Sequence, residues 1–436
     1  MRIRHLLTVT LATAMLLLAG CASGASEPEP TRTEAAGTKP AELPETPAGE
    51  RMRWLHELLE GDDDVTPHDL DGVFSEEFTA AVPLDEVVSL LNTNIRPAAP
   101  FALRDYVGDE LSASVVFEGA IGEPFTAQLS VTSDGTITGL QLLPELEHEA
   151  ATSLDEVQER LAALPVSTEL FVRVDDDDVA ATDGEARPIG SIFKLWVLLA
   201  VVDAIDAGEL SWGDELTVTD DAKSLPSGRL QDEPSGTTVT VAEAAELMIS
   251  ISDNTATDLL MTAAGRERVS TAAPESMRPV ASTAEMFELL YGGDAERLAA
   301  YEAADAAGRQ EILDGIDSLT VEVSDVDLTV SMVAAPTWQA TPADIVDAYD
   351  QLAEDATAHP EVDAALSANP GVPVEGYDSL WFKGGSLSGA VAGSWRGMLP
   401  SGETVTVVVI AWGDTQPVAD ATVETLLLAG DALALP

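Results

Sequence analysis

The 436-residue sequence contains a single cysteine, Cys21, which excludes a disulfide within the chain. Basic residues are scarce: 21 Lys and Arg stand against 77 Asp and Glu, and the formal net charge is −56. Such an acidic surface repels nucleic acid, so we expect no nucleic-acid partner. The histidines and the acidic runs lack the spacing of zinc or calcium ligands, and we therefore expect neither a metal site nor a cofactor.

Long apolar runs are missing as well, because the apolar segment near the start is shorter than a membrane span normally needs. Residues 6–18 follow a basic start and lead into Leu18-Ala19-Gly20-Cys21. This ending resembles a bacterial lipobox, which implies cleavage ahead of Cys21 and a diacylglycerol thioether on its sulfur. We expect residues 1–21 to be a lipoprotein signal peptide and the mature protein to be extracytoplasmic, with Cys21 as its lipid anchor in the membrane. An uncleaved apolar helix is the alternative.

Composition and periodicity divide the rest of the chain into a tether and two domains. Residues 22–49 are rich in Pro, Ala, Glu and Thr without an apolar period, which is typical of a disordered tether. Residues 50–149 combine short helices, one of them expected over residues 70–78, with alternating strands around residues 111–117 and 125–131. Helices followed by an antiparallel sheet resemble the steroid-isomerase and nuclear-transport-factor type of α+β domain. This segment contains no motif that indicates a catalytic reaction.

Residues 150–436 begin with a helix and a strand, continue as mostly helical sequence and end with strands and a closing helix. This order predicts an antiparallel sheet covered by an all-helical lobe, again of the α+β class. An apolar helix over residues 192–207 and a helix over residues 342–355 belong to that lobe. The acidic stretch over residues 282–316 is expected to be mostly helical.

Three short motifs occur in this second domain: Ser191-Ile192-Phe193-Lys194, Ser252-Asp253-Asn254 and Lys383-Gly384-Gly385-Ser386. Ser191 begins the apolar helix, where free backbone N–H groups stabilise negative charge. Lys194 lies one turn later on the same face, among apolar neighbours that depress a lysine pKa, so it is a candidate general base for Ser191. Taken alone, the first motif also fits an ordinary helix start and the second a helix N-cap.

Together and in this order, the motifs resemble those of class A β-lactamases and penicillin-binding proteins, and the likeness covers residues from about 165 to the end. The whole chain is similar to two-domain actinobacterial serine hydrolases. These join a steroid-isomerase-like N-terminal domain to a β-lactamase-like domain, as in the clavulanic-acid-cluster type and its mycobacterial lipoprotein relatives.

The resemblance implies a role for each motif residue. Ser191 would be the acylated nucleophile, Lys194 its base, and Ser252 the relay of a proton to the leaving group. Lys383 would polarise Ser252 and hold a substrate carboxylate, and Asn254 would bind the substrate amide and Lys194. The remaining substrate-binding candidates are Gly385 and Ser386. The backbone N–H groups of Ser191 and Ser386 would form the oxyanion hole.

Two departures from the family pattern matter. Gly384 stands where Thr or Ser is usual, so a hydroxyl for the substrate carboxylate is missing, and Ser386 or Ser388 is a candidate replacement. The glutamate that activates the deacylating water in class A enzymes has no convincing match, with Glu285 and Glu288 as the candidates. Slow hydrolysis of a β-lactam acyl-enzyme follows, which favours an esterase or a D-alanyl carboxypeptidase.

The sequence therefore predicts an extracytoplasmic serine hydrolase with an acyl-serine mechanism on an amide or ester. A β-lactam, a peptidoglycan stem peptide and a small ester are the substrate classes. The alternative is a lipoprotein that binds β-lactam or peptidoglycan without turnover, or a scaffold. Isomerase chemistry in the N-terminal domain is a third hypothesis, for which no acid/base pair is identifiable.

Overall fold

The computed structural model describes residues 43–436 except 62, 76–77, 80–81, 122–123, 145–147, 182–183, 317, 327–328, 330, 334–336 and 373. The expected signal peptide with Cys21, and most of the expected tether, lie outside the described residues. The described chain forms two compact units, one ending at residue 147 and one beginning at residue 148. None of its helices is both long and apolar enough to cross a membrane.

The smaller unit packs helix α2 (Pro47–Glu60) on a four-stranded antiparallel sheet of order β1-β2-β3-β4. Its strands are β1 (Phe101–Gly108), β2 (Ser112–Gly119), β3 (Phe125–Val131) and β4 (Ile137–Pro144). Along β3, buried side chains alternate with more accessible ones, as a half-buried strand requires. Helix α2 begins at Pro47, with the Thr46 hydroxyl accepting from Gly49 N at 3.1 Å, so ordered structure starts before residue 50.

The helix expected over residues 70–78 is not formed over residues 71–75, whereas Phe78 and Thr79 are helical. The 3-10 turn η1 (Pro67–Leu70) ends at Leu70. Phe74 then forms a parallel bridge with Ile137 instead of a helical turn. The Phe74 ring also stacks on Phe78 at 4.4 Å, so tertiary contacts override the helical period. The remaining short elements of this unit are α4 (Leu84–Leu90), the π turn η2 (Leu91–Ile95) and η3 (Arg96–Ala98).

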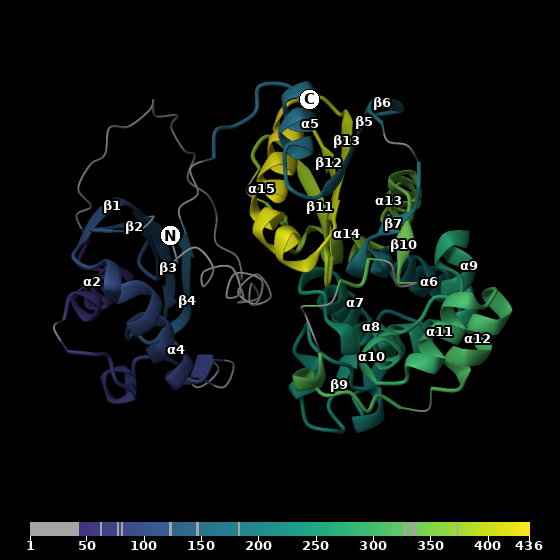
Figure 1. Ribbon diagram of the computed structural model, residues 1–436, viewed down its shortest axis with the longest axis horizontal. Coiled ribbons are helices and arrows are strands. Elements are labelled where there is room, and N and C mark those ends of the chain that lie inside the picture. Colours follow the sequence, from purple (N-terminus) through teal and green to yellow (C-terminus); the bar gives the residue numbers. More distant parts are fainter. Residues whose placement is uncertain are drawn as a thin grey trace. The chain divides into compact units, whose positions relative to one another are not determined.

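The larger unit is built on a five-stranded antiparallel sheet of order β11-β12-β13-β5-β6. Its strands are β11 (Ser379–Leu387), β12 (Ala390–Met398), β13 (Thr404–Trp412), β5 (Ser167–Val174) and β6 (Asp177–Ala180). Helices α5 (Leu154–Ala162) and α15 (Thr415–Ala434) cover one face (Figure 1). The helical lobe packs on the other face, so the expected α+β architecture of sheet and lobe is confirmed.

Helix α6 (Lys194–Asp206) lies at the centre of the lobe and is buried over most of its circumference, as expected for a helix that is apolar all round. The other helices of the lobe are α7 (Val241–Ser250), α8 (Asn254–Ala264), α9 (Arg266–Ala272), α10 (Thr283–Tyr291), α11 (Ala295–Ala303), α12 (Ala306–Asp314), α13 (Pro342–Asp355) and α14 (Pro360–Ser367). Three of them, α10 to α12, occupy the acidic stretch that was expected to be helical.

Short elements connect these helices. The two-stranded pairs are β7 (Arg187–Pro188) with β10 (Gln339–Ala340), and β8 (Glu215–Thr217) with β9 (Thr238–Thr240). The 3-10 turns are η4 (Gly190–Phe193), η5 (Asp220–Ala222), η6 (Leu230–Asp232), η7 (Glu275–Met277) and η8 (Val323–Asp325). Turn η4 matters most for the site, because it leads directly into α6.

Candidate active site

Ser191 lies in the tight turn η4, and Lys194 is the first residue of α6. Phe193 fixes this turn, because its ring stacks on Trp338 with centroids 4.3 Å apart and planes 2° apart. Ser191 is half-buried, and its hydroxyl has no hydrogen bond within the described part of the chain. A partly accessible serine hydroxyl without a partner among the described residues is available to a ligand.

The turn that carries Ser191 approaches strand β11 more closely than side chains allow. A Cβ atom added at Gly190, which has φ +51°, would lie 2.7 Å from Ser386 N. A Cβ atom added at Gly385 would lie 1.9 Å from Ile189 O and 2.8 Å from Ser191 N. Glycine at both positions therefore brings the backbone amides of Ser191 and Ser386 side by side, which is the arrangement of an oxyanion hole.

The amine of Lys194 is fully buried and points at the second motif. Its Nζ donates to Ser252 O at 2.5 Å, Asn254 Oδ1 at 2.7 Å and Ser252 Oγ at 3.1 Å. Burial lowers the pKa of Lys194 to about 7, although the carboxylates of Asp253 and Asp258 act in the opposite direction. A large share of Lys194 is therefore neutral near pH 7 and able to accept a proton.

Lys383 reaches the same hydroxyl from the sheet. Its Nζ lies 3.1 Å from Ser252 Oγ and donates to Gly384 O at 2.8 Å. The side chain is only 2% exposed, and burial together with the charge of Lys194 lowers the pKa of Lys383. The strand is held from behind, because Ser394 Oγ donates to Lys383 O at 2.9 Å and Tyr349 OH donates to Ser394 O at 3.0 Å.

The loop of residues 225–230 holds the second motif in place, and the sequence alone did not identify it. Ser252 has φ +59°, a strained value for a residue other than glycine, and its carbonyl also accepts from Ser227 Oγ at 2.8 Å. The buried Asp253 carboxylate accepts three backbone N–H groups, from Arg229 at 2.7 Å, Ala256 at 2.8 Å and Leu230 at 3.0 Å.

Asn254 completes this arrangement, since its amide donates to Leu225 O at 3.0 Å. The structure thus brings the candidates of all three motifs together: Ser191, Lys194, Ser252, Asn254, Lys383, Gly385 and Ser386. Ser227 lies outside the three motifs, so the sequence alone gave no sign of its role. Asp258 follows Asn254 by one helical turn and could have been found from that period.

The space beside Gly384 is filled by an aromatic ring. A Cβ atom at this position would lie 2.8 Å from the Phe382 ring, which itself packs on Trp395 with centroids 5.0 Å apart. The candidate replacement hydroxyl of Ser388 is buried and lies 3.3 Å from Thr415 Oγ1. Ser386 is exposed and, two residues along the strand, shares the face of Gly384.

The two glutamates considered for deacylation have structural partners. Glu285 Oε2 accepts from Arg266 Nη2 at 2.6 Å and from Ser282 N at 2.8 Å. Glu288 Oε2 accepts from Thr320 N at 2.7 Å, and its Oε1 accepts from the Thr320 hydroxyl at 2.9 Å. These contacts cap α10 and tie a loop to it, so they do not identify a group that activates water.

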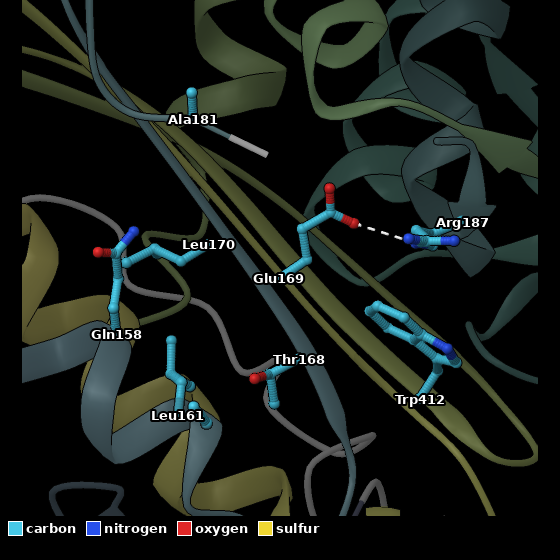
Figure 2. A pocket seen from close by; sticks show the side chains of 9 residues that line it. Gln158, Leu161, Thr168, Glu169, Leu170, Ala181, Arg187 and Trp412 are labelled. Carbon is cyan, nitrogen blue, oxygen red and sulfur yellow. Dashed lines mark hydrogen bonds and ion pairs between the residues drawn. The ribbon is translucent and has the colours of Figure 1, made fainter. Parts of the chain in front are cut away.

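A pocket of about 280 Å³, whose lining includes no residue of the three motifs, lies between α5 and the start of β5 (Figure 2). In it, Glu169 Oε2 accepts from Arg187 Nε at 3.2 Å, and the guanidinium of Arg187 lies 4.7 Å from the centre of the Trp412 ring. Arg187 belongs to β7, four residues before Ser191. These contacts anchor the segment that leads into η4.

A family model matches each of the two units. Residues 43–137 match the family model described as the N-terminal region of the ORF 12 gene product, and residues 155–365 match the model described as the beta-lactamase enzyme family. No curated protein matches the chain. The second match, together with the sheet and its helical lobe, identifies the fold of the larger unit as β-lactamase-like.

Similar solved structures each align with about two thirds of the chain. A beta-lactamase from Sphaerobacter thermophilus has 22% identity and TM-score 0.45 over 64% of this chain and 97% of that chain. A representative of class A beta-lactamase from Bacteroides cellulosilyticus has 18% identity and TM-score 0.43 over 64% of this chain and 94% of that chain. A PBP-A variant in acyl-enzyme complex with penicillin G has 14% identity and TM-score 0.44 over 64% and 95%.

Proposed function

We propose that the larger unit is a serine hydrolase that forms an acyl-enzyme on Ser191 with an ester or amide substrate. One observation carries the proposal. The buried amine of Lys194 follows Ser191 by one turn, has a pKa of about 7 and shares the hydroxyl of Ser252 with Lys383. A neutral amine at Ser252, and the hydroxyl of Ser191 next to two neighbouring backbone amides, are the base, the nucleophile and the oxyanion donors that acyl transfer needs.

The reaction follows from these positions. Ser191 Oγ attacks the substrate carbonyl carbon and its proton passes to neutral Lys194. The carbonyl oxygen becomes an oxyanion between the N–H groups of Ser191 and Ser386. As the tetrahedral intermediate collapses, Ser252 donates its proton to the leaving oxygen or nitrogen, and the ammonium of Lys194 restores it. Hydrolysis of the acyl-serine by water then releases the acid.

The charges of the site favour substrates without a carboxylate near the scissile bond. The amine of Lys383 is buried, its hydrogen bonds go to Ser252 and Gly384, and its pKa is lowered. The usual hydroxyl is missing at Gly384, where Phe382 fills the space. The chain as a whole carries a net charge of −56, which repels anions. We therefore place a small neutral ester ahead of a β-lactam or a stem peptide.

Mass spectrometry of the intact protein tests the proposal. The full chain is exposed to p-nitrophenyl acetate or penicillin G, and its mass is followed over time. We expect one acyl adduct on Ser191, released faster for acetate than for penicilloyl. Turnover of the ester by a Ser191→Ala variant at the wild-type rate would falsify the acyl-serine mechanism.

A second candidate function is binding without turnover, as in a β-lactam sensor or a scaffold. This function is favoured because Glu285 is paired with Arg266 and Glu288 accepts hydrogen bonds from Thr320. Neither glutamate is therefore free to activate water. The same experiment separates the two functions, because this candidate gives an adduct that persists or no adduct at all.

We further propose that the protein is an extracytoplasmic lipoprotein resembling the two-domain actinobacterial serine hydrolases. The lipobox ending at Cys21 and the matches to residues 43–137 and 155–365 support it. Labelled palmitate supplied to an expressing bacterium should enter the wild-type chain and not a Cys21→Ala chain. Equal labelling of both would remove the anchor.

A further inference from the structure

We propose that Asp258 is a positioning residue for this reaction: its buried carboxylate holds the start of α10 on α8, next to the second motif, and adds a negative charge to the surroundings of Lys194. The inference rests on the proposed function and adds to it a residue outside the three motifs.

The carboxylate of Asp258 joins two helices. It lies on α8, one turn after Asn254, and its Oδ1 accepts from Thr283 N at 2.7 Å while its Oδ2 accepts from Ala284 N at 2.9 Å. Thr283 and Ala284 are the first two residues of α10, so a side chain from another helix satisfies two of its free N–H groups. Removing the carboxylate releases the start of α10 from α8.

A short series of contacts leads from this bridge to the amine of Lys194. Thr283 is buried, and its hydroxyl donates to Ser224 Oγ at 2.7 Å and lies 3.3 Å from Asn254 O. The amide oxygen of Asn254 accepts from Lys194 Nζ at 2.7 Å. The position of Asn254, and with it the acceptor that orients Lys194, therefore depends on a residue that Asp258 holds in place.

The charges around Lys194 give Asp258 its second role. Asp253 and Asp258 both favour the ammonium form of Lys194 against burial, and the amine of Lys383 faces it from β11. Around Asp258 itself stand Glu285 on α10 and Arg266 on α9, which form an ion pair. Burial raises the pKa of Asp258 to about 6, so its carboxylate is ionised where Lys194 loses its proton.

The sign of the effect follows from these charges. A nearby anion stabilises an ammonium, so loss of the Asp258 charge makes Lys194 easier to deprotonate and lowers its pKa below about 7. The acid limb of kcat/KM against pH, which reports the free enzyme, then moves to lower pH. A purely structural defect lowers the rate without moving that limb.

The test compares Asp258→Asn and Asp258→Ser with the wild-type full chain and with Glu288→Gln. Glu288 is a matched control. Like Asp258 it is buried, and its carboxylate, on α10, accepts hydrogen bonds from Thr320, yet it is not among the acids that act on Lys194. The measurement is kcat/KM for p-nitrophenyl acetate from about pH 5 to about pH 9, with the Ser191→Ala rate subtracted. Circular dichroism checks that each variant is folded.

We expect the acid limb to move to lower pH in both Asp258 variants and to stay in place in Glu288→Gln. Above the limb, Asp258→Asn should retain more kcat/KM than Asp258→Ser, because an amide oxygen still accepts one of the two N–H groups of α10. If the Asn variant does not fold, the Ser variant carries the charge test. An unmoved limb in a folded variant overturns this inference and leaves the proposed function standing, whereas a wild-type chain that is never acylated on Ser191 overturns both.

Discussion

The amines of Lys194 and Lys383 meet at one oxygen atom, because Nζ of each lies 3.1 Å from Ser252 Oγ. Both side chains are buried, and the charge of Lys194 contributes to the lowered pKa of Lys383. Two ammonium groups so close together repel each other, so the site favours a state with at least one neutral amine. With both amines donating to Ser252 Oγ, the hydroxyl proton of Ser252 is free to be donated to a third group.

The first prediction concerns pH. If neutral Lys194 is the base for Ser191, acylation falls as pH drops below about 7, where the amine becomes an ammonium. A Lys194→Arg variant stays protonated at every accessible pH and should lose a factor of ~10²–10⁴ in acylation rate. Stopped-flow acylation by p-nitrophenyl acetate measures both effects. Lys223→Arg, a change to a lysine outside the motifs, should leave the profile unchanged.

The second prediction concerns the proton that Ser252 gives to the leaving group. A Ser252→Ala variant should lose little rate with p-nitrophenyl acetate, whose leaving group departs as a stable phenolate, and about 10²-fold or more with an ethyl ester, whose alkoxide needs the proton. The ratio of kcat/KM for the two esters is the measurement. Ser250 is the matched control, because its hydroxyl donates to Glu246 O within α7. An equal loss with both esters would show that Ser252 does not protonate the leaving group.

The third prediction concerns the close approach of η4 and β11. Gly385→Ala places a methyl group 1.9 Å from Ile189 O and must separate the Ser191 and Ser386 amides. Loss of one oxyanion donor typically lowers the rate by ~10²–10³, so we expect a kcat effect of that size. Gly213→Ala is the control, since a Cβ atom there meets no atom within 4 Å. Wild-type kcat in folded Gly385→Ala would exclude these two amides as the oxyanion hole.

The motif residues were predictable because each chemical role needs a particular side chain at a particular step along a helix or strand. Ser191 and Lys194 are one helical turn apart, and burial of Lys194 follows from the apolar residues around it. The sheet and the lobe were likewise foreseeable from the mostly apolar runs that become β12 and β13, which are buried along nearly their whole length, and from the uniformly apolar α6.

The contacts that hold the motifs in place were not predictable. Ser227 lies 25 positions before Ser252 and reaches its carbonyl only once the lobe is folded. Gly190 and Gly385 are visible as glycines, yet the backbone that each one approaches is set by tertiary structure. In the smaller unit, the helical period of residues 70–78 does not produce a helix at residues 71–75, because Phe74 pairs with Ile137 there.

The last prediction links the site to stability. The pKa of Lys194 falls from 10.5 to about 7 on folding, a difference of about 3.5 units or ~5 kcal/mol as an upper estimate. The folded state therefore binds this proton more weakly than the unfolded state, and the resulting destabilisation is absent above about pH 10.5, grows as pH falls and is complete below about pH 7.

Lys194→Met removes this titration, so the variant should gain stability relative to wild type at neutral pH and lose the gain as pH rises toward 10. The net gain is smaller than the upper estimate, because Ser252 O and Asn254 Oδ1 each lose a donor. Urea unfolding at a series of pH values measures the difference, with Lys223→Met as the control that should show no such slope. A constant difference between Lys194→Met and wild type across this range would mean that the amine keeps an ordinary pKa in the folded chain, and Lys194 would then be unfit to deprotonate Ser191.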